Sequence, residues 1–257
     1  MRRILLWTGV VALAVAVTVL VFLPASWLGN IVERQSGGRL TLGDATGTLW
    51  NGSAFVGGAP GPGGAVTPLL PGRFSWRLSP LVLFGAVSMT LENPQALAQP
   101  VLVEGSWSEW QVSAGQLLLP AEGLAGLGAP LNTLAPSGKI RLSWNQLDLV
   151  REVNNVRVTG RTVLSMDDMG SRMAPIRPLG SYQMAMDWRG PQADLVLSTV
   201  RGALLLSGSG QLQNGRLRFS GQAAAADGYE DTLGNMLNLL GQRRMVNGKN
   251  IIALEFR

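Results

Sequence analysis

Residues 193–221 read ADLVLSTVRGALLLSGSGQLQNGRLRFSG, and this stretch decides the fold. Asn214-Gly215 is a strong type I′ turn signal, because both residues tolerate positive φ. A turn at this dipeptide sets Leu212 opposite Leu217 and Gly210 opposite Phe219, so apolar positions meet on one face. The sequence therefore predicts an antiparallel hairpin here.

A second two-residue turn is predicted at Arg201-Gly202. It sets Leu197 opposite Leu206 and Thr199 opposite Leu204. The two turns together predict one antiparallel meander with a shared apolar face. The residues on that face are Leu195, Leu197, Leu204, Leu206, Leu212, Leu217 and Phe219.

Strand periodicity extends through most of the chain. Apolar residues alternate with polar ones in three further segments, 73–79, 139–144 and 181–188, and Leu81 to Leu91 is interpreted as another strand. The 33 glycines and 14 prolines favour many turns over long helices. The predicted fold class is mainly β: an antiparallel meander sheet, curved or sandwich-like, with a few short helices.

Three segments break the strand pattern. Residues 25–35 predict a short amphipathic helix that Gly37-Gly38 ends, and Asp227 followed by Glu230 predicts a helix to about Leu240. We expect the apolar stripe of the second helix to pack on the sheet. Residues 57–64 have no periodicity and predict a mobile loop.

The N-terminal segment has the composition of a membrane helix. Arg2 and Arg3 precede an uncharged apolar run, Ile4 to Leu23, which as a helix would span roughly 30 Å, the thickness of a bilayer core. The positive-inside rule places the arginines in the cytoplasm and the rest of the chain beyond the membrane. The alternative is a cleaved signal peptide, although its apolar core would be shorter. The predicted domains are a transmembrane part, 1–23, and an exported β-rich part, 24–257.

The composition argues against most enzymatic chemistry. The chain contains no His and no Cys, which removes the commonest general base, the commonest metal ligand and all thiol chemistry. Asp167-Asp168 is an adjacent acidic pair, and we interpret it as a polar turn before Gly170. A Ser–Lys dyad would have to use Lys139 or Lys249, the only lysines. We predict no catalytic residues, no metal site, no cofactor and no enzymatic activity.

The net charge of +5 comes largely from arginines that stand singly along the predicted strands. This distribution indicates a solvated basic face and no nucleic-acid site. Two alternatives to a purely structural body stay open. The one-sided apolar face could close into a core or form a groove that binds or transfers lipid, and a hydrolase of cell-wall material would need a polar pocket that no motif indicates.

Several motifs together resemble one known family. The N-terminal ones are Leu23-Pro24, the stretch Gly47-Thr48-Leu49-Trp50-Asn51-Gly52-Ser53-Ala54, and Trp76-Arg77-Leu78-Ser79-Pro80. The later ones are Pro136-Ser137-Gly138-Lys139-Ile140 with Trp144, and Gly180-Ser181-Tyr182. Over nearly its whole length the chain thus resembles type II secretion system protein N, also called general secretion pathway protein N.

The resemblance implies a function and a set of signature residues. It implies an accessory inner-membrane subunit of a Gram-negative machine that exports folded proteins from the periplasm. Its partners would be other secretion subunits, and its role would be assembly or scaffolding, with no small-molecule substrate. The signature residues are Gly47, Thr48, Leu49, Trp50, Gly52, Trp76, Pro80, Gly138 and Tyr182.

Overall fold

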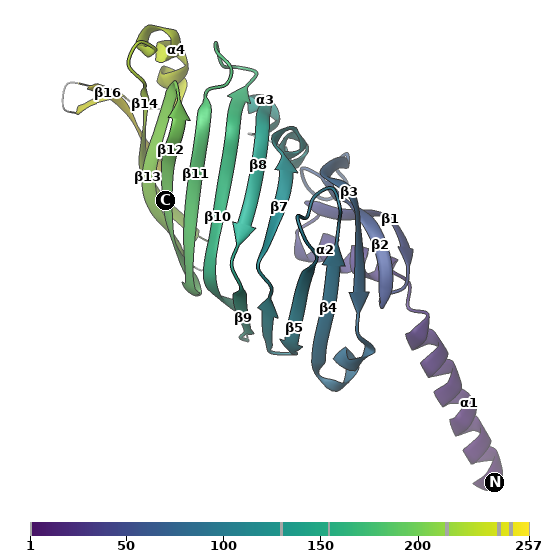
Figure 1. The fold of residues 1–257 in the computed structure, drawn as a ribbon. Helices are drawn as coiled ribbons and strands as arrows, with labels where there is room; N and C mark the ends of the chain where they lie inside the picture. The colour runs from purple at the N-terminus through teal and green to yellow at the C-terminus, as the bar shows by residue number, and fades with distance from the viewer. Residues whose placement is uncertain are drawn as a thin grey trace.

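The protein folds into one long antiparallel sheet with a helix that projects from its N-terminal end (Figure 1). The structure is a computed structural model. It describes residues 2–128, 131–153, 155–213, 216–240, 243–246 and 249–256.

The described helices are few and mostly short. The apolar N-terminal segment forms α1, and the predicted amphipathic segment forms α2. The helix predicted after Asp227 is also present, as α4. The helices are α1 Arg2–Val21, α2 Ser26–Gln35, α3 Leu131–Leu134 and α4 Glu230–Leu240, with 3₁₀ helices η1 Pro80–Phe84 and η2 Ala121–Leu127.

All sixteen described strands belong to the same sheet. In the N-terminal half they are β1 Leu40–Gly47, β2 Asn51–Gly58, β3 Thr67–Leu78, β4 Ala86–Glu92, β5 Val101–Ser106, β6 Glu109–Val112, β7 Gly115–Pro120 and β8 Pro136–Trp144. In the C-terminal half they are β9 Leu147–Arg151, β10 Val156–Ser171, β11 Gly180–Gly190, β12 Gln192–Gly202, β13 Leu204–Gln213, β14 Arg216–Ala225, β15 Arg243–Val246 and β16 Lys249–Phe256.

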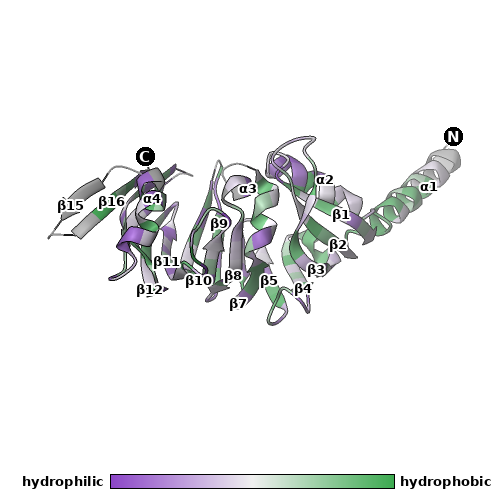
Figure 2. Ribbon diagram, turned by 90° about the horizontal axis from the view of Figure 1, so that it is seen from above, coloured by the Kyte–Doolittle hydropathy of each residue, from purple (hydrophilic) through white to green (hydrophobic). Residues whose placement is uncertain are grey.

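Most strands pair with their neighbours in sequence. The order runs from β1 to β6, then through β9 to β14, and ends with β16 and β15. The sheet branches at β10, since β9 pairs with its first residues and β8 with its later ones. β7 pairs with β8 and completes the branch. The meander prediction is confirmed, and the sheet is one curved layer with no second, sandwiched sheet among the described strands (Figure 2).

The registers test the two hairpin predictions. In β13 and β14, Leu212 pairs with Leu217 and Gly210 with Phe219, as predicted. The turn residues Asn214 and Gly215 lie outside the described residues. The register predicted at Arg201-Gly202 is wrong by two residues, because Leu197 pairs with Gly208. A shift of two residues keeps the same face, so the shared apolar face survives.

The side chain of Thr199 causes this shift. Its hydroxyl accepts a hydrogen bond from the Leu206 N–H at 2.6 Å and donates one to the Leu206 carbonyl at 2.8 Å. β12 therefore continues to Gly202, and the chain turns at the buried Ala203.

One face of the sheet is apolar along its whole length. We call it the inner face, and register places on it, among others, Trp76, Leu91, Trp144, Leu164, Met184 and Leu206. Helices α2 and α4 pack on this face at the two ends of the sheet. The prediction that the apolar stripe of α4 packs on the sheet is confirmed, since Leu233 and Leu237 are buried against Ala223 and Ile252. The opposite, outer face carries cross-strand ion pairs such as Arg161–Asp187 at 3.6 Å.

Three local predictions are wrong. Leu81 and Leu83 belong to η1, because the Ser79 hydroxyl caps the Leu81 N–H and Gly85 ends the turn at φ +96°. Gly57 and Gly58 are strand residues that pair with Thr41 and Leu40, so the loop begins at residue 59.

The third concerns the acidic pair. Asp167 and Asp168 form a β-bulge inside β10 and no turn, because Asp168 adopts a left-handed conformation at φ 49°.

Within the described part of the chain, no helix has the length and apolar character that crossing a bilayer would require. A membrane span in the N-terminal segment remains a prediction from the sequence.

Candidate functional site

The first signature motif forms the tight connection between β1 and β2. The Thr48 N–H donates to the Asn51 carbonyl at 2.9 Å, which closes the turn. Gly47 enters it at φ +85°, and a Cβ there would lie 2.5 Å from the Asn51 oxygen. Only glycine fits this position without strain, because an L side chain rarely adopts that φ and has no space here.

This turn holds the chain that leaves α1. The Leu49 N–H donates to the Leu23 carbonyl at 2.8 Å, and the Ala25 N–H donates to the Gly47 carbonyl at 3.1 Å. The Trp50 indole N–H donates to the Leu20 carbonyl at 2.8 Å, within the last turn of α1. The bond to Leu20 reaches one of the last carbonyls of α1, which the helix end leaves without an i+4 backbone partner. α1 is thus hydrogen-bonded to the first hairpin of the sheet.

Trp76 of β3 packs beneath the turn. Its side chain is buried, and its indole N–H donates to the Leu49 carbonyl at 3.0 Å. The ring covers Gly52, where a Cβ would lie 2.5 Å from the ring carbon Cζ2. We call the set Gly47, Thr48, Leu49, Trp50, Gly52 and Trp76 the junction, because it joins α1 to the sheet.

The other three signature residues lie outside the junction. Pro80 opens η1 beyond the end of β3. Gly138 of β8 has φ +124°, and a Cβ there would lie 2.8 Å from the Asp167 carbonyl oxygen. Tyr182 of β11 is buried and donates its hydroxyl to the Leu204 carbonyl at 3.0 Å, and burial raises its pKa to about 12. Each has a clear structural role, and they do not converge on a common site.

The acidic residues singled out from the sequence do not converge either. Asp167 lies 3.5 Å from Arg141, and Asp168 lies 2.7 Å from Arg201. Each carboxylate is thus paired with its own arginine at the surface of the sheet. Among the described residues, no group of three or more acidic side chains is placed to hold a metal ion.

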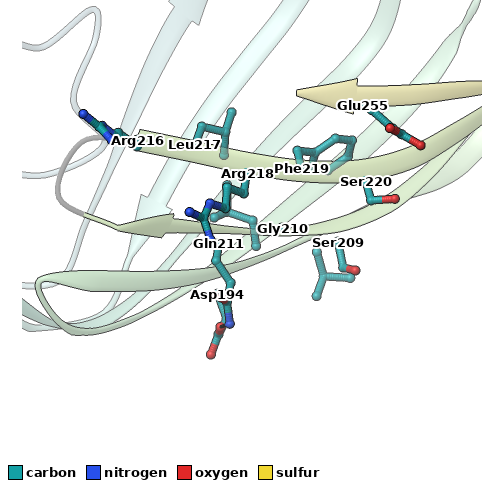
Figure 3. Close-up of a pocket in the computed structure, with 12 residues that line it drawn as sticks. Asp194, Ser209, Gly210, Gln211, Arg216, Leu217, Arg218, Phe219, Ser220 and Glu255 are labelled. Atoms are coloured by element: carbon teal, nitrogen blue, oxygen red, sulfur yellow. Dashed lines mark hydrogen bonds between the residues drawn. The ribbon is translucent and has the colours of Figure 1, made fainter. Parts of the chain in front are cut away.

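A broad hollow lies over β12, β13, β14 and β16 (Figure 3). It has a volume of about 1150 Å³ and is open to solvent. Asp194 projects from its lower side in the figure, where the Gln211 amide donates to it at 3.0 Å and Arg189 lies 3.5 Å away. The lining includes the hydroxyls of Ser209 and Ser220 and the carboxylate of Glu255.

Sequence reasoning found the signature residues but missed what they contact. The partners of the junction are the backbone carbonyls of Leu20 and Leu23, which no side-chain motif marks. The only hint in the sequence was that a turn rich in glycine and tryptophan follows the apolar N-terminal segment at a short distance along the chain. This closeness in sequence does not reveal that the turn and the segment are hydrogen-bonded.

The fold and the junction define a class of protein: a single-layer β-sheet body joined directly to an apolar helix. The chain belongs to the family described as Type II secretion system (T2SS), protein N, whose match covers residues 38–250. This match confirms the resemblance seen in the sequence and makes the chain a component of the type II secretion machinery of the cell envelope. No curated protein and no solved structure gives a significant match.

Proposed function

We propose that this chain is an accessory subunit that helps to assemble or scaffold the type II secretion machinery. The observation that carries the proposal is the junction, because it bonds the sheet to the end of α1 through Trp50 and Leu20, and to Leu23 and Ala25 just beyond the helix through two more hydrogen bonds. A scaffold must hold one part in a fixed place relative to another. The junction provides that function without any catalytic group.

We further propose that residues 4–23 anchor the protein in the inner membrane. The segment is uncharged and apolar, and its side chains from Trp7 onward are largely exposed in the structure. Exposed apolar side chains of this size are costly in water and favourable in lipid. Arg2 and Arg3 place the N-terminus in the cytoplasm, and the domain formed by 24–257 then lies in the periplasm.

The proposed partners are other subunits of the same machine. We expect no nucleic acid, no cofactor and no small-molecule substrate, and we propose no enzymatic activity. The exposed ion pairs on the outer face leave that face polar, as expected for transient protein contacts in the periplasm.

Co-purification from gently solubilised envelopes tests the scaffold role. Tagged wild-type protein should recover other secretion subunits. Trp50→Phe keeps the ring but removes the N–H that bonds Leu20, so it should recover them less efficiently. A matched control is Trp188→Phe, which removes an indole N–H that bonds the Thr162 hydroxyl in β10, far along the sheet. Recovery of no secretion subunit by the wild type would refute the proposal.

A second candidate function is lipid binding or transfer along the inner face. The specific observation is that the sheet is a single layer, so the middle of its apolar face has no second sheet over it. Leu164 and Met184, for example, lie on this face and are only partly buried. Mass spectrometry of the purified protein under native conditions tests this candidate. A spectrum that contains only the apo mass would count against a lipid carrier.

A further inference from the structure

The connections between strands divide into two edges of the sheet. Because the strands are antiparallel, alternate connections lie at the same edge. The lower edge in Figure 1 contains the β1–β2 junction, from which α1 departs. The same edge carries the connections β3–β4, β5–β6, β9–β10, β11–β12 and β13–β14.

Two of these connections form an exposed apolar tip. It consists of Leu81, Leu83 and Phe84 of η1 together with Trp107 between β5 and β6. Phe84 is 85% exposed, and Leu81 and Trp107 are each 58% exposed. Large apolar side chains gathered in this way on a soluble surface usually mark a contact site.

The tip is held together as one unit. The Trp107 indole N–H donates to the Val82 carbonyl, so the β5–β6 turn is fixed against η1. Ser79 caps the start of η1, and Gly85 closes its end. The hydrogen bond uses the polar atom of the indole and leaves much of its apolar ring exposed, as in tryptophans at a membrane interface.

The charge of the lower edge fits an anionic surface. Within its connections and the two strand residues on each side, the sequence has five arginines and two glutamates. Three of these arginines form ion pairs, Arg77 with Glu92, Arg157 with Glu152 and Arg189 with Asp194, so the excess positive charge rests on the other two. Arg151 and Arg216 are exposed there. The upper-edge segment that leads into α4 is acidic instead, with Asp227, Glu230 and Asp231. A basic edge is attracted to the anionic headgroups of a membrane.

We infer that the lower edge is a second membrane-contact site, in which Leu81, Leu83, Phe84 and Trp107 insert into the interface of an anionic bilayer beside α1. The inference rests on the proposed anchor, since α1 departs from the same edge and brings it close to the lipid. A contact through both α1 and the tip fixes the tilt of the sheet on the membrane, which a single helix with one exit point does not do.

Site-specific labelling tests the inference on the full chain. The protein has no native cysteine, so each introduced cysteine takes a single label. Leu81→Cys carries an environment-sensitive fluorophore at the tip. Val66→Cys is the matched control, because Val66 is 56% exposed but lies in the β2–β3 connection at the opposite edge. Leu13→Cys reports on α1.

The labelled proteins are reconstituted into vesicles of phosphatidylethanolamine and phosphatidylglycerol that contain nitroxide lipids. We expect blue-shifted emission and nitroxide quenching at positions 13 and 81, and neither at position 66. Quenching at 13 without quenching at 81 overturns the inference and leaves the anchor intact. Absence of quenching at 13 refutes the anchor itself. A label at position 81 that is shielded from solvent in native envelopes but not in these vesicles also overturns the inference, because it indicates a protein partner.

Thermal unfolding of the three labelled proteins shows whether each retains the fold. A second variant, Leu81→Ser with Phe84→Ser, removes apolar area from exposed positions and should not disturb the core. Labelled at Ser108→Cys, an exposed position next to Trp107, this variant should lose the quenching that the same label shows in the otherwise wild-type chain. Unchanged quenching would contradict insertion of the tip.

Discussion

Gly52→Ala tests the packing of the junction directly. Gly52 is followed by Ser53 in β2, and its Cα faces the ring of Trp76. The Cβ of an alanine would lie 2.5 Å from the ring carbon Cζ2 and 2.7 Å from the Thr48 carbonyl oxygen. Both distances are well below van der Waals contact. Either the indole or the turn must move, and the indole is held by its bond to Leu49.

Overpacking of this kind costs about 1–3 kcal/mol. For a domain of this size, a loss of about 2 kcal/mol lowers the melting temperature by roughly 4–8 °C. Circular dichroism in the β-sheet region, followed during heating of the detergent-solubilised protein, measures the shift. Tryptophan fluorescence should change as well, because the ring of Trp76 is displaced.

Gly43→Ala is the matched control. Gly43 lies in the adjacent strand β1, and a Cβ there meets no atom within 4 Å. Its substitution is expected to be neutral, or to stabilise the protein by up to about 1 kcal/mol because alanine lowers the conformational entropy of the unfolded chain. If Gly52→Ala proved as stable as Gly43→Ala, the close packing of Trp76 over Gly52 would be refuted.

Three further changes test other parts of the structure. Tyr182→Phe removes a buried hydrogen bond and should cost about 1 kcal/mol at neutral pH in urea unfolding. Because burial raises the pKa of Tyr182 to about 12, the contribution of this tyrosine to folding stability is present below pH 10 and is lost as the pH rises toward 12. The phenylalanine variant should therefore lose less stability than the wild type over that range. An equal alkaline loss in both proteins would contradict the assigned burial. Leu233→Ala, in the fully buried contact of α4 with the sheet, should destabilise by about 3 kcal/mol, and a loss below about 1 kcal/mol would show that α4 does not pack as described. Release of the chain after Leu23 by an engineered protease site should leave a folded β domain but impair secretion, and full secretion by the released domain would contradict the anchoring role.

The strand pattern of this protein could be predicted because each face of the sheet has its own chemistry. The alternation of Leu212, Leu217 and Phe219 with polar residues fixed both the hairpin and its register, and the structure confirms both. The predicted packing of α4 depended on the same reasoning, since Leu233 and Leu237 share a stripe that needs a partner.

The errors arose where a side chain takes the place of a backbone partner. Thr199 bonds both the N–H and the carbonyl of Leu206, and no strand pattern encodes that choice. At η1, the alternation of Leu81 and Leu83 resembled a strand, but the Ser79 cap and Gly85 impose a 3₁₀ turn. Local hydrogen bonds of this kind compete with the sheet ladder and override periodicity.

The candidate site was only partly accessible from the sequence. The signature residues from Gly47 to Gly52 and Trp76 do gather in one place, but the sequence offered no reason to connect them to the end of α1. Pro80, Gly138 and Tyr182 carry the same family signature and lie apart from the junction. Residues that maintain the fold and residues that join two parts of the protein cannot be told apart by their sequence motifs.

The near-sequential strand order also has a consequence for how the chain acquires its structure. Most pairings join neighbouring hairpin arms, so each new strand closes only a short loop on an existing template, and the entropy cost of each step is small. The pairs β8–β10 and β14–β16 each skip one strand, and the longest gap is spanned by β6–β9, in which Trp110 pairs with Leu149 across β7 and β8. We therefore expect two half-sheets to form first, one on each side of the β6–β9 pair, each by adding strands one after another. Closure of β6 on β9 should be the slow step that turns two half-sheets into one.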